Sequence, residues 1–205
     1  ALYRGQTAGG FGKSVRTYNV TQGFAVTTVV QGEVVISADP STVLVTLLGS
    51  CISVCMYDPV AGIGGMNHFL LPGDGGGQDG VAMRFGVNSM EMLINGILKG
   101  GGNRARLVCK AFGGAAVVPS LGRIGQENVQ FVTDYLKDEG ISCVSQSFGG
   151  NQARRVRFWP TTGRAQQNLV QDAQTVGRQE EAYRRRETEA ERKWAKEVDS
   201  GVELF

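Results

Sequence analysis

Residues 45–72 read VTLLGSCISVCMYDPVAGIGGMNHFLLP. Two largely apolar runs, Ile52–Tyr57 and Ile63–Leu71, flank a short segment that contains proline and glycine. Such runs separated by turn-forming residues predict a β-hairpin. Because the turn centres near residue 60, we expect Cys51 and His68 to be approximate cross-strand partners.

Alternating apolar patterns predict further strands on both sides of this hairpin. They cover Glu33–Ile36, Val43–Leu47, Arg104–Phe112, Ile141–Phe148 and Arg154–Trp159, with one more near Phe24–Val30. The two runs nearest the C-terminus are expected to pair through Gly149-Gly150-Asn151. Helical spacing of apolar residues predicts helices over Arg84–Lys99 and Ile124–Glu139. Strands outnumber helices without alternating with them, which predicts an α+β fold, a layered α/β sandwich of β-sheets with two main helices.

The chain of 205 residues divides by composition into three parts. Residues 1–30 are glycine-rich and polar and are interpreted as a lead-in, and residues 31–170 carry the patterned domain. Residues 171–205 are dense in charged helix formers, which predicts a solvated helical extension. Its last residues, Leu204 and Phe205, are a candidate docking element.

Composition excludes several classes of protein. The net charge of +2 is too small to predict nucleic-acid binding or membrane binding by electrostatics. The chain has no apolar run of about 20 residues for a membrane span, and its N-terminus lacks the apolar core of a secretion signal. Four cysteines do not make a disulfide scaffold in a chain of this length. We therefore expect a cytoplasmic protein with reduced thiols.

Two short motifs fail on inspection. Thr7–Ser14 resembles a phosphate loop but lacks its first glycine and the preceding hydrophobic strand. A zinc site built from Cys51, Cys55 and His68 has a loose C-x₃-C spacing and no second cysteine pair. The sequence therefore predicts neither a metal nor a cofactor.

The chemistry centres on Cys51 and the single histidine of the chain, His68. A glycine-serine pair precedes Cys51, and backbone amides at such a turn stabilise a thiolate or an oxyanion. A cysteine within hydrogen-bond reach of a histidine is typical of thiol nucleophilic catalysis. On the residues alone two plainer interpretations stay open, a histidine satisfied in the core and a cysteine that only packs. Cys109 and Cys143 lie in strand patterns and are interpreted as small buried hydrophobes.

The segment at residues 45–72 resembles the signature of the CheD family, the chemoreceptor glutamine deamidases of bacterial chemotaxis. Later segments follow the family pattern in order, at residues 110–114 (KAFGG), 124–129 (IGQENV) and 149–163. The resemblance covers about residues 32–170, and several ordered motifs are more specific than any one of them.

This resemblance implies a Cys-His-Thr active site. Cys51 matches the nucleophile, His68 matches the histidine of the GGMNHFLLP motif, and Thr46 is the candidate for the third residue, a threonine shortly before the cysteine. The implied reaction is hydrolysis of glutamine side chains on receptor helices to glutamate, through a thioester, by a protein-glutamine glutaminase. The implied fold is similar to the catalytic domain of the cytotoxic necrotizing factor toxins.

The family also implies a partner, the CheC phosphatase that acts on the response regulator CheY. One alternative is therefore a non-catalytic adaptor that binds and activates such a phosphatase. Another is a different thiol amidohydrolase or a peptidase with the same chemistry. The loop Pro72–Val81 adjoins His68 and is expected either to flank the cleft or to be a plain surface loop.

Overall fold

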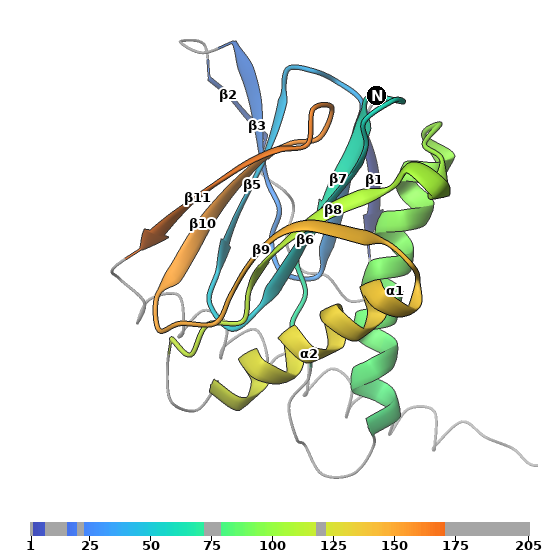
Figure 1. The fold of residues 1–205 in the computed structure, drawn as a ribbon. Helices are drawn as coiled ribbons and strands as arrows, with labels where there is room; N and C mark the ends of the chain where they lie inside the picture. The colour runs from blue at the N-terminus through green and yellow to red at the C-terminus, as the bar shows by residue number, and fades with distance from the viewer. Residues whose placement is uncertain (1, 7–15, 20–22, 72–78, 118–121, 171–205) are drawn as a thin grey trace, which may run out of the picture.

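The computed structural model describes residues 2–6, 16–19, 23–71, 79–117 and 122–170 (Figure 1). The six-stranded sheet has the order β1 (Leu2–Gln6), β4 (Glu33–Ser37), β7 (Ile63–Asn67), β6 (Ile52–Asp58), β8 (Val108–Gly113), β9 (Ser142–Phe148). The five-stranded sheet has the order β11 (Arg164–Val170), β10 (Ala153–Trp159), β5 (Thr42–Leu48), β3 (Phe24–Thr28), β2 (Arg16–Asn19). The helices are α1 (Asp79–Lys99) and α2 (Gly122–Asp138). This confirms the predicted α+β class with two main helices and two sheets.

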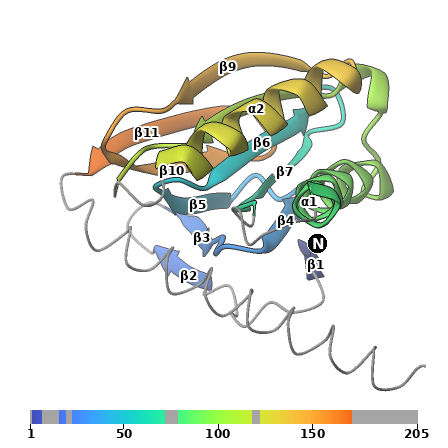
Figure 2. The ribbon, with the colours of Figure 1, turned by 90° about the horizontal axis from the view of Figure 1, so that it is seen from below.

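The layers follow from the two faces of the six-stranded sheet. One face packs against α1 and α2, and the other packs against the five-stranded sheet (Figures 1 and 2). Its central strands β4, β6 and β7 are therefore buried on both faces, which explains their nearly continuous apolar sequences.

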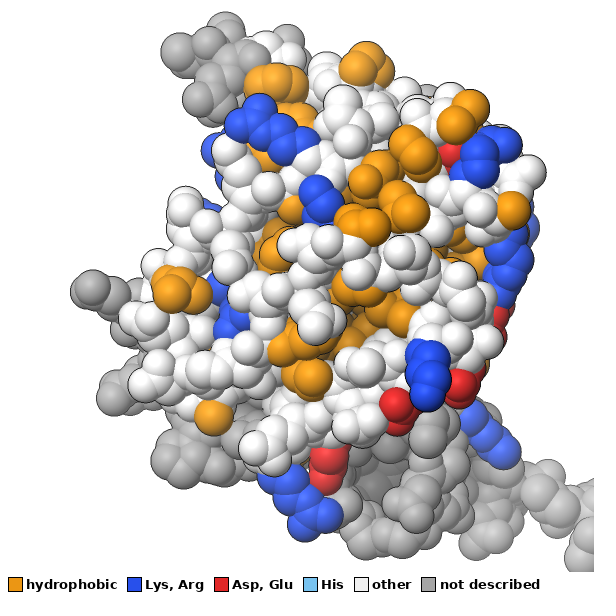
Figure 3. All heavy atoms as spheres, viewed as in Figure 1, with side chains coloured by type: hydrophobic (Ala, Val, Ile, Leu, Met, Phe, Trp, Pro, Cys, Tyr) orange, Lys and Arg blue, Asp and Glu red, His pale blue; other side chains and the backbone are white. Residues whose placement is uncertain are grey.

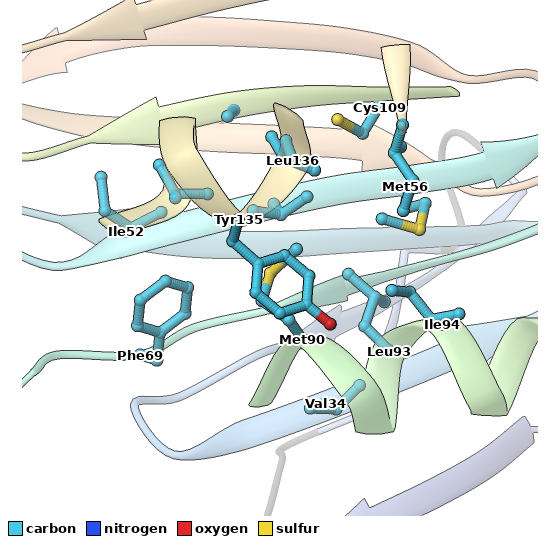
Figure 4. Close-up of a cluster of buried hydrophobic side chains, with 14 of the residues drawn as sticks. Val34, Ile52, Met56, Phe69, Met90, Leu93, Ile94, Cys109, Tyr135 and Leu136 are labelled. Carbon is cyan, nitrogen blue, oxygen red and sulfur yellow. The ribbon is translucent and has the colours of Figure 1, made fainter. Parts of the chain in front are cut away.

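Alternation along β6 assigns its side chains to two cores. Ile52, Val54 and Met56 point to the helices, whereas Cys55, and Cys51 in the bend just before β6, point to the five-stranded sheet. Figure 4 shows the core on the helix side, where Met90, Leu93 and Ile94 of α1 and Tyr135 and Leu136 of α2 meet Ile52, Met56 and Phe69. The cysteine face of β6 therefore belongs to the second core, between the sheets.

The predicted hairpin is confirmed as β6 and β7, which pair antiparallel. The predicted strand at Ile63–Leu71 ends earlier than expected, at Asn67, and only the isolated bridge between Ile52 and Phe69 continues the pairing. The strand at Arg104–Phe112 is also shorter than expected, because Arg104–Arg106 form a 3₁₀ turn before β8. Helix α1 begins at Asp79 and α2 at Gly122, a few residues before their predicted starts.

The predicted pairing of the two late strands is wrong. β9 lies parallel to β8 in the six-stranded sheet, whereas β10 lies between β5 and β11 in the other sheet. The connection turns at Gly149 and Gly150, with φ of 71° and 76°, and the Gly149 N–H donates to the carbonyl of Gly113. These glycines carry the chain from one sheet to the other, an outcome that short-range turn patterns do not distinguish from a hairpin.

The described parts of residues 1–30 contribute strands to both sheets. β1 pairs with β4, and β2 pairs with β3, which itself lies parallel to β5. Strands β1, β2 and β11 were not predicted from the sequence. The charged C-terminal segment and its candidate docking residues lie outside the described residues, and the three-part division of the chain stays a prediction.

Strands β9 and β11 are each one edge of a sheet, and both are labelled in Figure 1; Figure 3 shows the surface of the molecule from the same side. Both are mostly exposed, and Val144 and Leu169 are among the exposed large hydrophobic residues. Hydrophobic side chains gather across the middle of this face, and basic side chains lie around them. The candidate site described below lies elsewhere, between the sheets.

Asp58 secures the turn of the β6–β7 hairpin. Its buried carboxylate accepts hydrogen bonds from the N–H groups of Val60, Ala61 and Asn103 and forms an ion pair with Arg106. The Arg106 guanidinium and these amides hold the pKa of Asp58 well below its usual range, against the effect of burial. The same contacts hold the 3₁₀ turn that begins after Asn103.

We expect Asp58→Asn to lower the free energy of unfolding at neutral pH, because the ion pair and the charge-assisted hydrogen bonds are lost. Since the folded pKa of Asp58 is depressed, its stabilisation is present above the unfolded pKa of about 4 and declines below it. Urea denaturation at several pH values should show the gap between wild type and variant narrowing as the pH falls below about 4. A gap that widens on acidification would contradict this account.

Candidate active site

The three residues of the predicted site lie at one end of the sheets, the end seen in Figure 2, where β5 and β7 end and β6 begins. Thr46 is in β5, Cys51 is in the bend between β5 and β6, and His68 follows β7. All three are buried, with exposed fractions of 1%, 0% and 6%. They occupy the space between the two sheets, where an apolar surround strengthens electrostatic interactions.

Cys51 and His68 are diagonal neighbours, a position close to the approximate cross-strand pairing that the sequence predicted. Ile52 pairs with Phe69, and their N–H and C=O groups exchange both hydrogen bonds, at 2.9 Å each. This register sets Leu70 opposite Cys51 and leaves His68 two residues away along the same face. Side chains in this diagonal relation remain within reach of each other across an antiparallel pair.

Thr46 and His68 are in direct contact. Oγ1 of Thr46 lies 2.8 Å from Nδ1 of His68 and donates its proton to the carbonyl of Val29, also at 2.8 Å. A hydroxyl group has one proton to donate, so Oγ1 must accept at its contact with the imidazole. Nδ1 of neutral His68 therefore carries the ring proton, and Nε2 carries the lone pair that can take a proton.

Hydrogen bonds to the carbonyls of Ser50 and Cys51 fix the orientation of the peptide groups around Cys51. Nδ2 of Asn128 donates to the carbonyl of Ser50 at 3.1 Å, and the N–H of Gly114 donates to the carbonyl of Cys51 at 2.9 Å. Because a trans peptide is planar, the N–H of Cys51 points away from Asn128. Asn128 also accepts from the N–H of Leu71 at 2.8 Å, so this one amide joins the cysteine bend to the segment after His68.

Sequence reasoning missed Asn128 and Gln31. Asn128 is completely buried although it lies on a helix, four residues after Ile124 and four before Val132. That spacing puts a polar side chain on the apolar face of α2, which could have marked it as a buried hydrogen-bonding residue. Gln31 lies in the turn before β4, and its Oε1 accepts a hydrogen bond from Sγ of Cys51 at 3.5 Å. Polar residues are common in turns, so the sequence gives no reason to identify Gln31 as a site residue.

The other cysteines differ from one another. Burial raises the pKa of the Cys55 thiol far above its usual range. Cys109 is buried as predicted, and its hydrogen bond to Cys143, together with burial, raises its pKa. Cys143 is only partly buried, which corrects its interpretation as a buried hydrophobe, and the hydrogen bond with Cys109 lowers its pKa to about 7. Cys143 is thus a partly accessible thiol distant in sequence from the candidate site.

Within the described parts of the chain, no three or more His, Cys, Asp and Glu side chains are grouped so that they could hold a metal ion. The rejected phosphate-loop motif at residues 7–14 lies outside the described residues, as do residues 72–78 of the predicted loop Pro72–Val81. The last three residues of that predicted loop belong instead to helix α1. No described helix combines the length and the apolarity that crossing a membrane requires.

Fold and site together define a mixed α+β protein with a cysteine, an oriented histidine and a threonine between two sheets. The family model described as CheD chemotactic sensory transduction matches residues 70–168. A protein of Cereibacter sphaeroides named probable chemoreceptor glutamine deamidase CheD is 51% identical over 160 residues, covering 78% of this chain and 80% of its own. The chain belongs to the CheD family.

Two further relatives carry the same name. One from Agrobacterium fabrum is 50% identical over 147 residues, covering 72% of this chain and 81% of its own. One from Caulobacter vibrioides is 53% identical over 143 residues, covering 69% and 76%. Among solved structures, a Neisseria meningitidis protein is 10% identical with a TM-score of 0.39 and covers 64% of each chain, too weak a likeness to carry an argument.

Substitution of Gly113 tests how closely strand β8 packs against the backbone of Cys51. Its φ is +124°, and a Cβ there would lie 1.9 Å from the carbonyl oxygen of Cys51. Gly101 has a similar φ of +102°, but a Cβ added there would meet nothing within 4 Å, so it reports backbone strain alone. We expect Gly101→Ala to cost about 1–2 kcal/mol and Gly113→Ala about 1–3 kcal/mol more.

Chemical denaturation of both variants measures this difference directly. Equal losses of stability in the two variants would contradict the close approach of Gly113 to Cys51.

Proposed function

We propose that this protein hydrolyses the side-chain amides of specific glutamines on chemoreceptors to glutamate, with Cys51 as nucleophile and His68 as base. In enzyme terms it is a protein-glutamine glutaminase. Membership in the CheD family supports the reaction, because the relatives described above are named probable chemoreceptor glutamine deamidases. The single observation that carries the mechanism is the contact of Thr46 with Nδ1 of His68, which leaves Nε2 as the basic nitrogen.

In the first half-reaction, Nε2 of His68 takes the thiol proton and Sγ of Cys51 attacks the amide carbon of the substrate. A carbon–sulfur bond forms, and the π electrons of the carbonyl move to its oxygen. Backbone amides near Ser50 and Cys51 stabilise this oxyanion. The intermediate then collapses, the carbon–nitrogen bond breaks, and His68 returns the proton to the departing ammonia.

In the second half-reaction, His68 takes a proton from water, and the resulting hydroxide attacks the thioester carbon. Collapse of this intermediate releases glutamate and returns the proton to Cys51. A glutamyl methyl ester would follow the same thioester route, since only the leaving group differs. The net reaction consumes one water and releases one ammonia for each glutamine.

The product places a carboxylate where a neutral amide stood on a receptor helix. Like charges on neighbouring positions of a helix repel by about 0.2–0.5 kcal/mol each. Deamidation at several sites would therefore shift the packing of the receptor helices by small increments, which suits a system that tunes a signal.

Several finer expectations remain predictions beside this proposal. They are the likeness of the sandwich to the cytotoxic necrotizing factor catalytic domain, a charged helix in residues 171–205, a cytoplasmic location and a CheC-type phosphatase partner. The adaptor alternative is distinguished by Cys51→Ser, which would retain phosphatase binding and normal chemotaxis if the protein acted only through its partner.

The direct test is incubation of the purified protein with a receptor cytoplasmic fragment, followed by peptide mass spectrometry for conversion of Gln to Glu. We expect wild type to convert specific glutamines and Cys51→Ala to lose at least about 10³-fold in rate. Cys55→Ala serves as a control that removes a neighbouring buried thiol on the same face of β6. Equal conversion by wild type and Cys51→Ala would refute Cys51 as the nucleophile.

Thr46→Val tests the orientation of the histidine. The change conserves shape but removes both the acceptor for Nδ1–H and the donor to the Val29 carbonyl. We expect a roughly tenfold to hundredfold fall in deamidation rate, similar to the loss of outer partners of ligating histidines. Thr46→Ser retains the hydroxyl and should keep most of the activity, so similar losses in both variants would point to packing instead.

A further inference from the structure

Gln31 occupies a corner that the chain builds next to the candidate nucleophile. The N–H of Glu33 donates to the carbonyl of Val30 at 3.0 Å, and Gly32 has φ of 85°. No described residue other than glycine has a positive φ, so this is a type II turn with Gln31 at its second position. The turn is tied to His68, whose carbonyl accepts from the N–H of Gly32 at 2.7 Å.

The backbone hydrogen bonds between this turn and His68 fix the position of Gln31 relative to the histidine. The N–H of His68 donates to the carbonyl of Glu33 at 3.0 Å, so His68 is bonded to the turn through both of its backbone groups. The stretch just before the turn also supplies the Val29 carbonyl, which accepts from Thr46. One short segment therefore positions Thr46, His68 and Gln31 together.

Of the two polar atoms in the Gln31 carboxamide, only Oε1 has a hydrogen-bond partner among the described residues. The residue is 9% exposed, and Oε1 accepts from Sγ of Cys51 at 3.5 Å. Nε2 is buried, and no hydrogen-bond acceptor for it lies among the described residues. A buried amide donor without a partner is unfavourable and is rare in folded proteins unless it serves a function. Because Nε2 lies beside the candidate nucleophile, its acceptor is expected to be an atom of the bound substrate.

We propose that Gln31 is a catalytic residue whose Nε2–H donates a hydrogen bond to the oxyanion of the tetrahedral intermediates. This inference rests on the proposed glutamine deamidation. It adds a side-chain donor to the backbone amides already assigned to the oxyanion. The acceptor it recognises is the carbonyl oxygen of a primary carboxamide or of the thioester derived from it.

The reach of the carboxamide fits this role. Once the carbon–sulfur bond has formed, the oxyanion lies one atom beyond Sγ, and an effective donor sits about 2.7–3.1 Å from it. The carboxamide already contacts Sγ, and its last torsion is broad and roughly two-fold. Rotation about that torsion exchanges Oε1 for Nε2, so the same group can accept from the resting thiol and then donate to the oxyanion.

The bonds and protons balance in both half-reactions. In acylation, the S–C bond forms, the carbonyl π pair becomes the third lone pair of the oxygen, and Nε2–H of Gln31 donates to it without proton transfer. The pair returns to re-form C=O as the C–N bond breaks, and the nitrogen takes the proton held by His68. In deacylation, the hydroxide from water replaces the nitrogen, and the C–S bond breaks in its place.

The test compares Gln31→Met and Gln31→Glu with wild type by the mass-spectrometric deamidation assay on the receptor fragment. Methionine keeps approximate length without a donor, whereas glutamate keeps the shape and the acceptor but not the N–H. We expect both to lower the rate of deamidation by about 10²–10³-fold. Circular dichroism and urea denaturation of the variants show whether the fold is retained.

A second measurement separates a donor to the oxyanion from a residue that only orients the thiol. Alkylation of Cys51 by iodoacetamide as a function of pH reports the thiol itself. It is measured in the full chain carrying Cys143→Ser, because Cys143 is partly exposed and its pKa of about 7 would add a competing reaction. Because Gln31→Met removes the acceptor of the thiol proton, we expect the midpoint of this profile not to rise, while the deamidation rate falls.

Two outcomes would overturn the inference. One is a deamidation rate for Gln31→Met within about threefold of wild type. The other is a shifted alkylation profile that accounts for the whole loss in rate, which would make Gln31 a positioning residue for the thiol. If wild type converts no glutamine, or converts it as fast as Cys51→Ala, the proposed function itself fails, and the two failures are therefore distinguishable.

Discussion

The pairing of Ile52 with Phe69 is the constraint on which the site depends. It continues the register of the β6–β7 hairpin past the end of β7 and sets His68 on the same face as Cys51. A slip of one residue in either segment would turn one of these side chains toward the helices. The helix-side core opposes such a slip, because Ile52 and Phe69 are both completely buried within it.

Given this register, hydrogen bonds determine the tautomer of His68 and the orientation of the Cys51 amide. The single hydroxyl proton of Thr46 goes to Val29, which decides the tautomer of His68. Asn128 holds the Ser50 carbonyl, which decides the direction of the Cys51 amide. In a low-dielectric space between two sheets, such fixed dipoles act without having to reorganise during the reaction. Preorganisation of this kind supports the proposed deamidation chemistry.

Much of this fold was predictable because its central strands carry strong local patterns. The hairpin, both helices and the α+β class follow from runs such as Ile52–Tyr57, where period and flanking turn residues agree. The pairing of β9 and β10 was not predictable from Gly149 and Gly150, since a turn sequence does not say which sheet the next strand joins. Strands β1, β2 and β11 are polar edge strands with little apolar alternation, so they left no pattern to read.

The amino-acid sequence is enough to select the candidate reactive residues. A single histidine, one cysteine after a glycine-serine pair and the resemblance to the CheD family identify Cys51, His68 and Thr46 as the candidates. Folding is needed to show that Thr46 faces Nδ1 of His68. It also brings in Gln31 and Asn128, which contact Cys51 and Ser50 from 20 and 78 residues away in sequence. Contacts between residues so far apart in sequence arise from the packing of two sheets and a helix. The spacing of residues along the chain therefore does not predict them.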